Sequence, residues 1–180
     1  MPDFSSLEDQ IRECFGRVVY THKTHEKMAD NCARTLWRFK VAQIAVSALT
    51  ACGALSRVCG HAVAKGCDGF IRLCISGYMK GFDPGGTAQK HRDTAANLWV
   101  IRESYLSLLT DLRMQAIRSE EAIKQRDELQ RKLAAIYAGG HAHECKGILA
   151  SSKRAQKNED YTFSDAEIDK FVPSSLRKTK

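Results

Sequence analysis

The chain has 180 residues, a formal net charge of +7 and only three prolines. This length suits one domain with a substantial buried core. The charge is spread along the chain, with seven Lys and Arg against six Asp and Glu in residues 1–40, and seventeen against fourteen in residues 81–180. Because it forms no concentrated patch, we expect no sequence-specific nucleic-acid binding. Seven cysteines behind an acidic N-terminal stretch predict free thiols rather than a disulfide scaffold.

Outside residues 53–86 the sequence is rich in Ala, Leu, Arg, Lys and Glu, which predicts an all-α fold. The first helix should begin near Ser5, because Ser5 and Glu8 form a capping box. No proline or glycine pair interrupts the pattern before residue 41, so we expect the helix to continue into the next segment. Positions of its buried face recur at steps of three and four residues: Leu7, Ile11, Cys14, Val18, His25, Cys32, Leu36 and Phe39.

Residues 41–56, VAQIAVSALTACGALS, carry no charged side chain. A membrane-spanning helix needs roughly 20 mostly apolar residues, and core helices more often carry runs of about 10 to 14. The run leaves both interpretations open. Residues 41–79 have room for a helical hairpin, whose second helix, about residues 62–79, contains three charges. Each charge at a bilayer centre costs about 2.5 to 3.5 kcal/mol, so the second helix alone would not be called transmembrane.

Polar residues of this second helix fall on one helical face, because His61, Lys65, Asp68, Arg72 and Ser76 step by four, three, four and four. The first four are the candidate site residues. In a protein surrounded by water, such a stripe is the wet side of an amphipathic helix. In a membrane, ionisable residues instead face a bundle interior or a water-filled path. The stripe is therefore a candidate pore lining, with the wet helix face as the alternative.

Cysteines and glycines alternate along the hairpin at spacings that let helices approach closely. A tight hairpin in water is the alternative, and zinc is disfavoured because no C-x-x-C pair occurs. The candidate packing positions are Cys52, Gly53, Cys59, Gly60, Gly66, Cys67, Cys74 and Gly77.

The clearest break in the chain is KGFDPGGTAQKH, where Asp83, Pro84, Gly85 and Gly86 predict an interhelical turn and Thr87 a helix cap. One long helix should then run to Gly139. Its approximate heptad seam needs an apolar partner, which the first helix or a second subunit can supply. The seam comprises Leu98, Ile101, Tyr105, Leu108, Leu112, Ile123, Leu129, Leu133 and Ile136.

Residues 1–140 are therefore expected to form one helical domain, and residues 141–180 a flexible polar tail. Ser164 and Glu167 predict one short helix before Pro173, and the basic end should be mobile. His141, His143 and Cys145 in HAHEC have metal-ligand side chains, but a fourth ligand is not evident, and a polar loop is the simpler interpretation. We expect no metal, no cofactor and no catalytic residues.

Three stretches resemble the SLATT family of small bacterial proteins with two predicted transmembrane helices. They are IRECFGRVVYTHKTHEKMAD (residues 11–30), KVAQIAVSALTACGALS (residues 40–56) and GYMKGFDPGGTAQKHRDTAANLWVIRESYLSLLTDL (residues 77–112). The similarity covers about residues 8–137. Lys65, Asp68 and Arg72 interrupt the second apolar segment that the family pattern expects.

The resemblance implies an all-α protein of the bacterial inner membrane with both termini cytoplasmic, which acts in antiphage defence by perturbing the membrane or forming pores. It further implies activation by a partner: a nucleotide-second-messenger synthase, a nucleotide sensor or a reverse transcriptase. No catalytic residues are known for the family, so none is transferred.

The hypothesis we favour is a non-enzymatic effector that forms a homo-oligomeric helical bundle. In this bundle the hairpins cluster and the polar stripe lines a conducting path. Location in the cytoplasm before activation remains open. One alternative is a soluble helical module that binds and regulates an adjacent defence enzyme such as a reverse transcriptase. A third hypothesis is a metal-dependent enzyme that uses the HAHEC residues.

Overall fold

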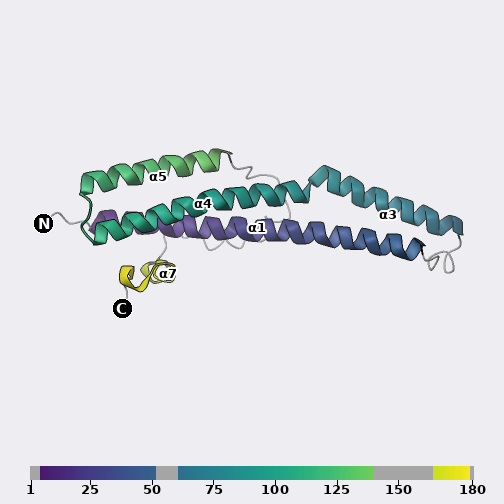
Figure 1. Ribbon diagram of the computed structural model, residues 1–180, viewed down its shortest axis with the longest axis horizontal. Coiled ribbons are helices and arrows are strands. Elements are labelled where there is room, and N and C mark those ends of the chain that lie inside the picture. Colours follow the sequence, from purple (N-terminus) through teal and green to yellow (C-terminus); the bar gives the residue numbers. More distant parts are fainter. Residues whose placement is uncertain (1–4, 52–60, 140–163, 179–180) are drawn as a thin grey trace. The chain divides into compact units, whose positions relative to one another are not determined.

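The computed structural model describes residues 5–51, 61–139 and 164–178. Within these ranges every regular element is helical and no strand occurs, which confirms the predicted all-α fold (Figure 1). The elements are α1 (Ser5–Ala51), α3 (His61–Phe82), α4 (Pro84–Arg113), α5 (Ser119–Gly139), α7 (Asp165–Ile168) and a 3₁₀ turn, η1 (Ser174–Leu176).

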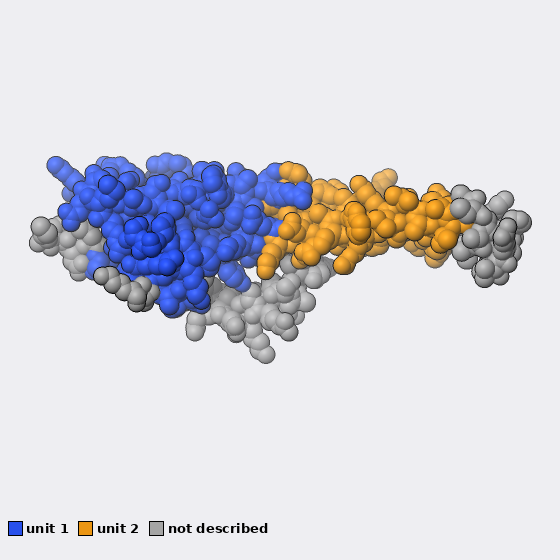
Figure 2. Space-filling view, turned by 60° about the horizontal axis from the view of Figure 1, so that its bottom comes forward, with its two compact units in different colours: residues 1–26, 92–180 blue, residues 27–91 orange. Residues whose placement is uncertain are grey.

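The chain divides into two compact units, coloured separately in Figure 2. Unit 1 comprises residues 1–26 and 92–180, and unit 2 comprises residues 27–91. The continuity of α1 through residue 40, expected from the sequence, is confirmed. Since α1 and α4 each cross a unit boundary, both units are built on these two helices.

Unit 1 contains a hydrophobic core to which α1, α4, α5 and the C-terminal residues all contribute. Six seam residues predicted for the second long helix are buried in it, among them Leu98 and Tyr105, which are 0% exposed. Burial raises the pKa of the Tyr105 hydroxyl far above its ordinary value. Ile123 is 39% exposed, and Ala122 is buried beside the seam instead.

The prediction of one helix from Thr87 to Gly139 is wrong, because α4 ends at Arg113 and α5 begins at Ser119. Gln115 adopts a left-handed φ of 53°. The Gln115 N–H donates to the Leu112 carbonyl (3.0 Å) and the Ala116 N–H to the Asp111 carbonyl (2.9 Å), which is the Schellman pattern of a helix end. Because α5 starts anew at Ser119, the heptad phase of α4 does not carry across, and Ile123 leaves the seam.

The predicted break between α3 and α4 is confirmed, but its cap is Asp83 rather than Thr87. Asp83 has a φ of 34°, and its carboxylate accepts a hydrogen bond from the Gly86 N–H (3.0 Å). Pro84 is the first residue of α4, a position where its missing N–H costs nothing. Gly85 and Gly86 therefore lie in the first turn of α4 rather than in an irregular turn.

The remainder of unit 2 consists of the second half of α1 beside α3. The rings of Phe39 and Tyr78 lie 4.6 Å apart between centroids, so the predicted pairing of the two helices is present. The connection between them, residues 52–60, lies outside the described residues. We expected two membrane helices here, but in the described ranges no helix combines the length and apolar character needed to cross a membrane.

The predicted short helix after Ser164 is confirmed as α7, with the Ser164 N–H donating to the Glu167 carboxylate (3.1 Å). We expected it in a flexible tail. Instead Ile168, Val172 and Leu176 are buried in the core of unit 1. The physical reason is that these three apolar side chains recur at intervals of four residues and cover the bundle of α1 and α4.

Candidate functional site

All positions of the predicted polar stripe fall on α3, an uninterrupted helix from His61 to Phe82. Arg72 is half-buried, and the side chains at positions 61, 65 and 68 lie outside the described part. Beyond Arg72, the predicted Ser76 is exposed at the edge of this face, whereas Ile75 is buried and Met79 is half-buried on it. The register of the stripe thus coincides with the inward side of α3 within unit 2, and its pore-lining role stays a prediction.

The outward sides of both helices in unit 2 carry large apolar side chains. On α3, Phe70 is 68% and Leu73 is 70% exposed; on α1, Val41 is 42%, Ile44 is 68% and Leu49 is 50% exposed. We call these five residues the outer apolar face. The arrangement is the reverse of an ordinary amphipathic hairpin in water, whose outward sides are polar.

Glycines flank Phe70 and Leu73 on α3. A Cβ atom built at Gly66, Gly69, Gly77 or Gly81 would have no described atom within 4 Å, so no helix of the described chain packs on them. Two of the predicted packing positions, Gly66 and Gly77, belong to this open row, and Cys74 is exposed. Packing of a second copy on the row stays a prediction. The other predicted positions, Cys52, Gly53, Cys59 and Gly60, and the side chain of Cys67, lie outside the described part.

The turn residues Asp83, Pro84, Gly85 and Gly86 form a tight junction within unit 2. A Cβ at Gly86 would lie 2.1 Å from the Asp83 Oδ2, and one at Gly85 would lie 3.4 Å from the Leu36 Cδ2. The junction therefore serves to cap α4 and to set α4 against α1. Its role is positional.

The HAHEC segment, residues 141–145, lies outside the described residues. Among the residues that the structure does describe, no group of three His, Cys, Asp or Glu side chains is placed to hold a metal ion.

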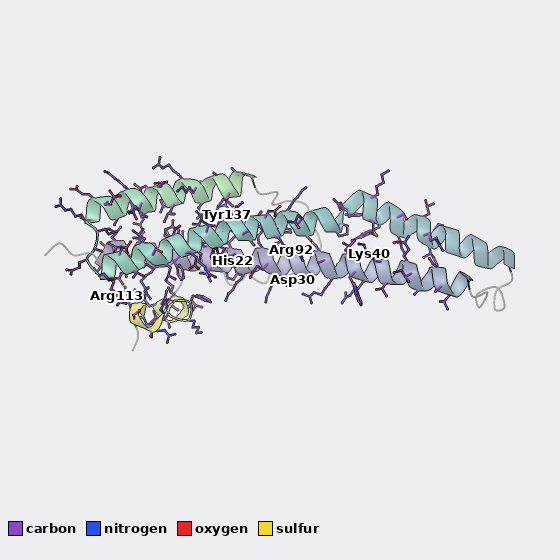
Figure 3. The ribbon with its side chains drawn as sticks, viewed as in Figure 1. His22, Asp30, Lys40, Arg92, Arg113 and Tyr137 are labelled. Carbon is purple, nitrogen blue, oxygen red and sulfur yellow. The ribbon has the colours of Figure 1, made fainter. Side chains whose placement is uncertain are left out.

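An open groove with a volume of about 720 Å³ lies between α1 and α4 in unit 1. Lys23, Arg92 and Arg102 provide cations, Glu26 provides a carboxylate, and Trp99 is 49% exposed. The Arg102 guanidinium is paired with the Glu103 carboxylate (2.6 Å). His22 on α1 and Arg92 on α4 mark its two walls (Figure 3). The His22 Nε2 lies 3.7 Å from a Glu26 carboxylate oxygen. Such a groove can attract an anionic group beside an aromatic ring.

A polar cluster, which was not predicted from the sequence, surrounds Arg12, whose side chain is 1% exposed. Its Nη1 donates to the Leu176 carbonyl (2.6 Å), and its Nη2 donates to the Asp169 carboxylate (2.5 Å). The Arg12 Nε lies 3.5 Å from the Asp165 carboxylate. The signal available in the sequence was the acidic pair Asp165 and Asp169, four residues apart on either side of Ile168.

Comparison with curated proteins and with solved structures gave no match. A model of the SMODS and SLOG-associating 2TM effector domain family 4 matches residues 7–167. The match includes all of α3, α4 and α5, α1 from residue 7 onward and α7 up to residue 167, as well as the three stretches that resemble SLATT proteins. The chain therefore belongs to this SLATT family of effector domains.

Proposed function

We propose that this chain is a non-enzymatic effector of bacterial antiphage defence which, once activated, assembles with other copies and perturbs the inner membrane through unit 2. The observation that carries the proposal is the outer apolar face. Exposed to water, five large apolar side chains on one hairpin are unfavourable, and transfer to lipid removes that cost at about 25 cal/mol per Å² of apolar surface.

The distribution of charge along α1 fits a boundary between water and lipid. Arg34, Arg38 and Lys40 are exposed, and no charged residue follows them before the end of α1 at Ala51. Cationic side chains at such a position can contact phosphate head groups while the following turns enter the apolar layer. Val41, Ile44 and Leu49 would then meet the acyl chains.

Assembly of several copies explains how a hairpin with inward polar positions can act in lipid. In an assembly, the face of α3 that carries Lys65, Asp68 and Arg72 would contact other polar groups or water rather than acyl chains. The open glycine row of α3 would let neighbouring helices approach closely, which supports association in lipid. We propose that this clustered state permeabilises the membrane and that a sensor, a nucleotide synthase or a reverse transcriptase triggers it.

The test is dye release from vesicles of phosphatidylethanolamine and phosphatidylglycerol by the purified full chain. We expect Leu73→Glu to reduce vesicle binding and leakage by about tenfold or more, because burying one leucine contributes about 1.5 to 3 kcal/mol. Met114→Glu is the matched control, since Met114 is 73% exposed but belongs to unit 1. It should leave leakage unchanged.

Two outcomes would overturn the proposal. One is leakage that is equal in the Leu73→Glu and Met114→Glu chains. The other is a wild-type chain that binds no vesicles, remains in the buffer fraction of cells after induction of the defence system, and copurifies in fixed stoichiometry with a defence enzyme such as a reverse transcriptase. That result would establish the alternative of a helical module that regulates an enzyme.

A further inference from the structure

The C-terminal residues 164–178, here called the arm, dock on unit 1 through contacts spread over their whole length. At the middle of the arm, the Lys23 ammonium lies 4.5 Å from the centre of the Phe171 ring. At its C-terminal end, Lys178 forms an ion pair with Asp9. The arm therefore follows α1 over about four turns.

The arm and α5 contact different sides of α1. Side chains of α5 reach Gln10, Cys14 and Thr21, whereas the arm contacts Asp9, Arg12 and Lys23. At 100° per residue, the centres of these two sets lie roughly 150° apart around the helix. Figure 1 shows the same arrangement, with α5 and α7 on opposite sides of α1 and α4. Removal of the arm would thus leave the contacts between α5 and α1 in place, while the core would lose Ile168, Val172 and Leu176.

The surface of α1 and α4 that the arm covers carries polar groups, as expected where a docked segment can dissociate. The partners that the structure gives to the Arg12 guanidinium all belong to the arm: Asp165, Asp169 and the Leu176 carbonyl. On α4, the Arg113 Nη1 donates to the Ser175 carbonyl (2.7 Å). When the arm leaves, both guanidinium groups regain water, which offsets part of the cost of exposing the apolar side chains that Ile168, Val172 and Leu176 cover. A surface that is always covered would gain more from apolar residues at these positions.

Recognition of the arm is nevertheless specific. Asp169 accepts from Arg12 and from the Lys178 N–H (3.2 Å), which folds the end of the arm back on α7. Ile168, Val172 and Leu176 add apolar burial at fixed spacing. The surface around Arg12 thus holds a short segment that carries carboxylates in its first turns, at Asp165 and Asp169, and an apolar residue at every fourth position.

We propose that the arm is exchangeable and that, in the assembled effector, the Arg12 surface of one copy holds the arm of a second copy. This inference rests on the assembly described under the proposed function. The same contacts form whether the arm comes from its own chain or from another, so exchange sacrifices no contact. The connection, residues 140–163, spans at most about 80 Å when fully extended. Crowding of copies on one membrane raises their effective concentration and favours exchange.

The first test adds a fluorescent peptide of residues 164–178 to the full chain and measures anisotropy. Asp169→Ala in the chain weakens its own arm, so this chain should bind the peptide at least about tenfold more tightly than the wild type. Lys170→Ala is the matched control, because Lys170 is exposed and next in sequence, and it should bind as the wild type does. A peptide carrying Asp169→Ala should bind at least about tenfold more weakly.

The second test mixes two full-length variants. An Arg12→Ala chain has an intact arm and a defective surface, and an Asp169→Ala chain has the reverse. Neither can form the Arg12–Asp169 pair alone, but the mixture can. We expect a 1:1 complex by native mass spectrometry in the mixture only. If circular dichroism shows that Arg12→Ala is unfolded, Arg12→Lys replaces it, because a lysine retains the charge but loses the two-point hydrogen bonding.

Absence of both peptide binding and the mixed complex, in folded chains, would overturn the inference and make the arm a fixed part of unit 1. Neither test uses lipid. Vesicle leakage without arm exchange would leave the proposed function standing while this inference fails, and arm exchange without leakage would do the opposite.

Discussion

Arg12 has the largest side chain among the fully buried residues of the described chain, and it is charged. A guanidinium can be buried only when carboxylates and carbonyl groups satisfy it, and removal of one partner of a buried pair is strongly destabilising. Asp169, itself 5% exposed, is the closest of its partners. One buried residue on α1 therefore depends on a segment more than 150 positions away.

His91 is the buried histidine at the point where α4 passes from unit 2 toward unit 1. Burial lowers the pKa of its imidazole below the ordinary value of 6.5, because desolvation disfavours the charged form. In the unfolded chain the imidazole binds a proton at a higher pH than in the folded chain. Folding stability is therefore unaffected by His91 above about pH 6.5 and falls as the pH drops below it.

We expect the melting temperature of the wild type to decrease as the pH is lowered from about 7.5 to about 5.5, and His91→Gln to reduce the steepness of that decrease, because glutamine takes up no proton. Differential scanning calorimetry at several pH values measures both slopes. Identical slopes for the two chains would show that His91 contributes nothing to the acid sensitivity.

Two helix junctions, at Asp83 and at Gln115, organise the elements of this chain. Both use a non-glycine residue with a positive φ, 34° at Asp83 and 53° at Gln115. At Asp83 the strain is offset by a side-chain cap on the Gly86 N–H, and at Gln115 by the two backbone hydrogen bonds of the Schellman pattern. Each junction thus supplies hydrogen-bond partners to backbone groups at a helix end that have no partner within the helix.

From the Asp83 junction we predict that alanine substitutions at two adjacent glycines change the free energy of unfolding in opposite directions. Gly85→Ala places its Cβ at ordinary contact distance from Leu36 and gains helix propensity, whereas Gly86→Ala displaces the Asp83 carboxylate from its cap. We expect the Gly86→Ala chain to be less stable than the Gly85→Ala chain by about 1 kcal/mol, the usual value of an N-cap. Urea denaturation followed by circular dichroism gives the difference. Equal stability, or the reverse order, would mean that the cap contributes little.

At the scale of the whole molecule, the two units differ in how much apolar surface they bury. The core cluster lies entirely in unit 1. In unit 2 the described buried apolar residues are mostly small: Ala29, Cys32, Ile75 and Ala88. Segments with few buried apolar contacts open locally at low free energy, and segments that move in function are drawn from them. Unit 2 is therefore the part of the chain that is suited to move from water into lipid.

Hydrogen exchange followed by mass spectrometry should reveal this difference. We expect backbone amides of α3 to exchange faster than those of residues 98–112 in α4, and addition of phosphatidylglycerol-containing vesicles to slow exchange in α3 but not in residues 98–112. Leu73→Glu should abolish the lipid-dependent protection while leaving exchange in α4 as before. Equal protection of α3 and α4 without lipid would contradict the distinction between the units.

Much of the local structure could be predicted because it depends on near neighbours in sequence. Ser5 and Glu8 indicated the start of α1, Ser164 and Glu167 the start of α7, and Asp83 and Pro84 the break before α4. The end of α4 could not be found in this way, since no glycine or proline marks it and Gln115 adopts its φ only because Asp111 and Leu112 offer their carbonyl groups. Ser119 followed by Glu120 and Glu121 was the one local sign of a new helix.

For the candidate site, the helical spacing of positions 61, 65, 68 and 72 followed from the sequence alone. The spacing could not say which side of α3 faces inward, because periodicity defines a face but not its partner. The structure decided this through Arg72, Ile75 and Met79 on one side and the exposed Phe70 and Leu73 on the other.

By itself, the sequence determined the all-α class, the continuity of α1, the position of the hairpin and membership of the family, since each depends on propensity, periodicity or a pattern of neighbouring residues. Only the tertiary structure decided that the C-terminal arm belongs to unit 1 and that Arg12 is buried. These features arise from contacts between residues far apart in the chain, such as Arg12 and Asp169, and the free energy of such contacts leaves no local pattern from which to predict them.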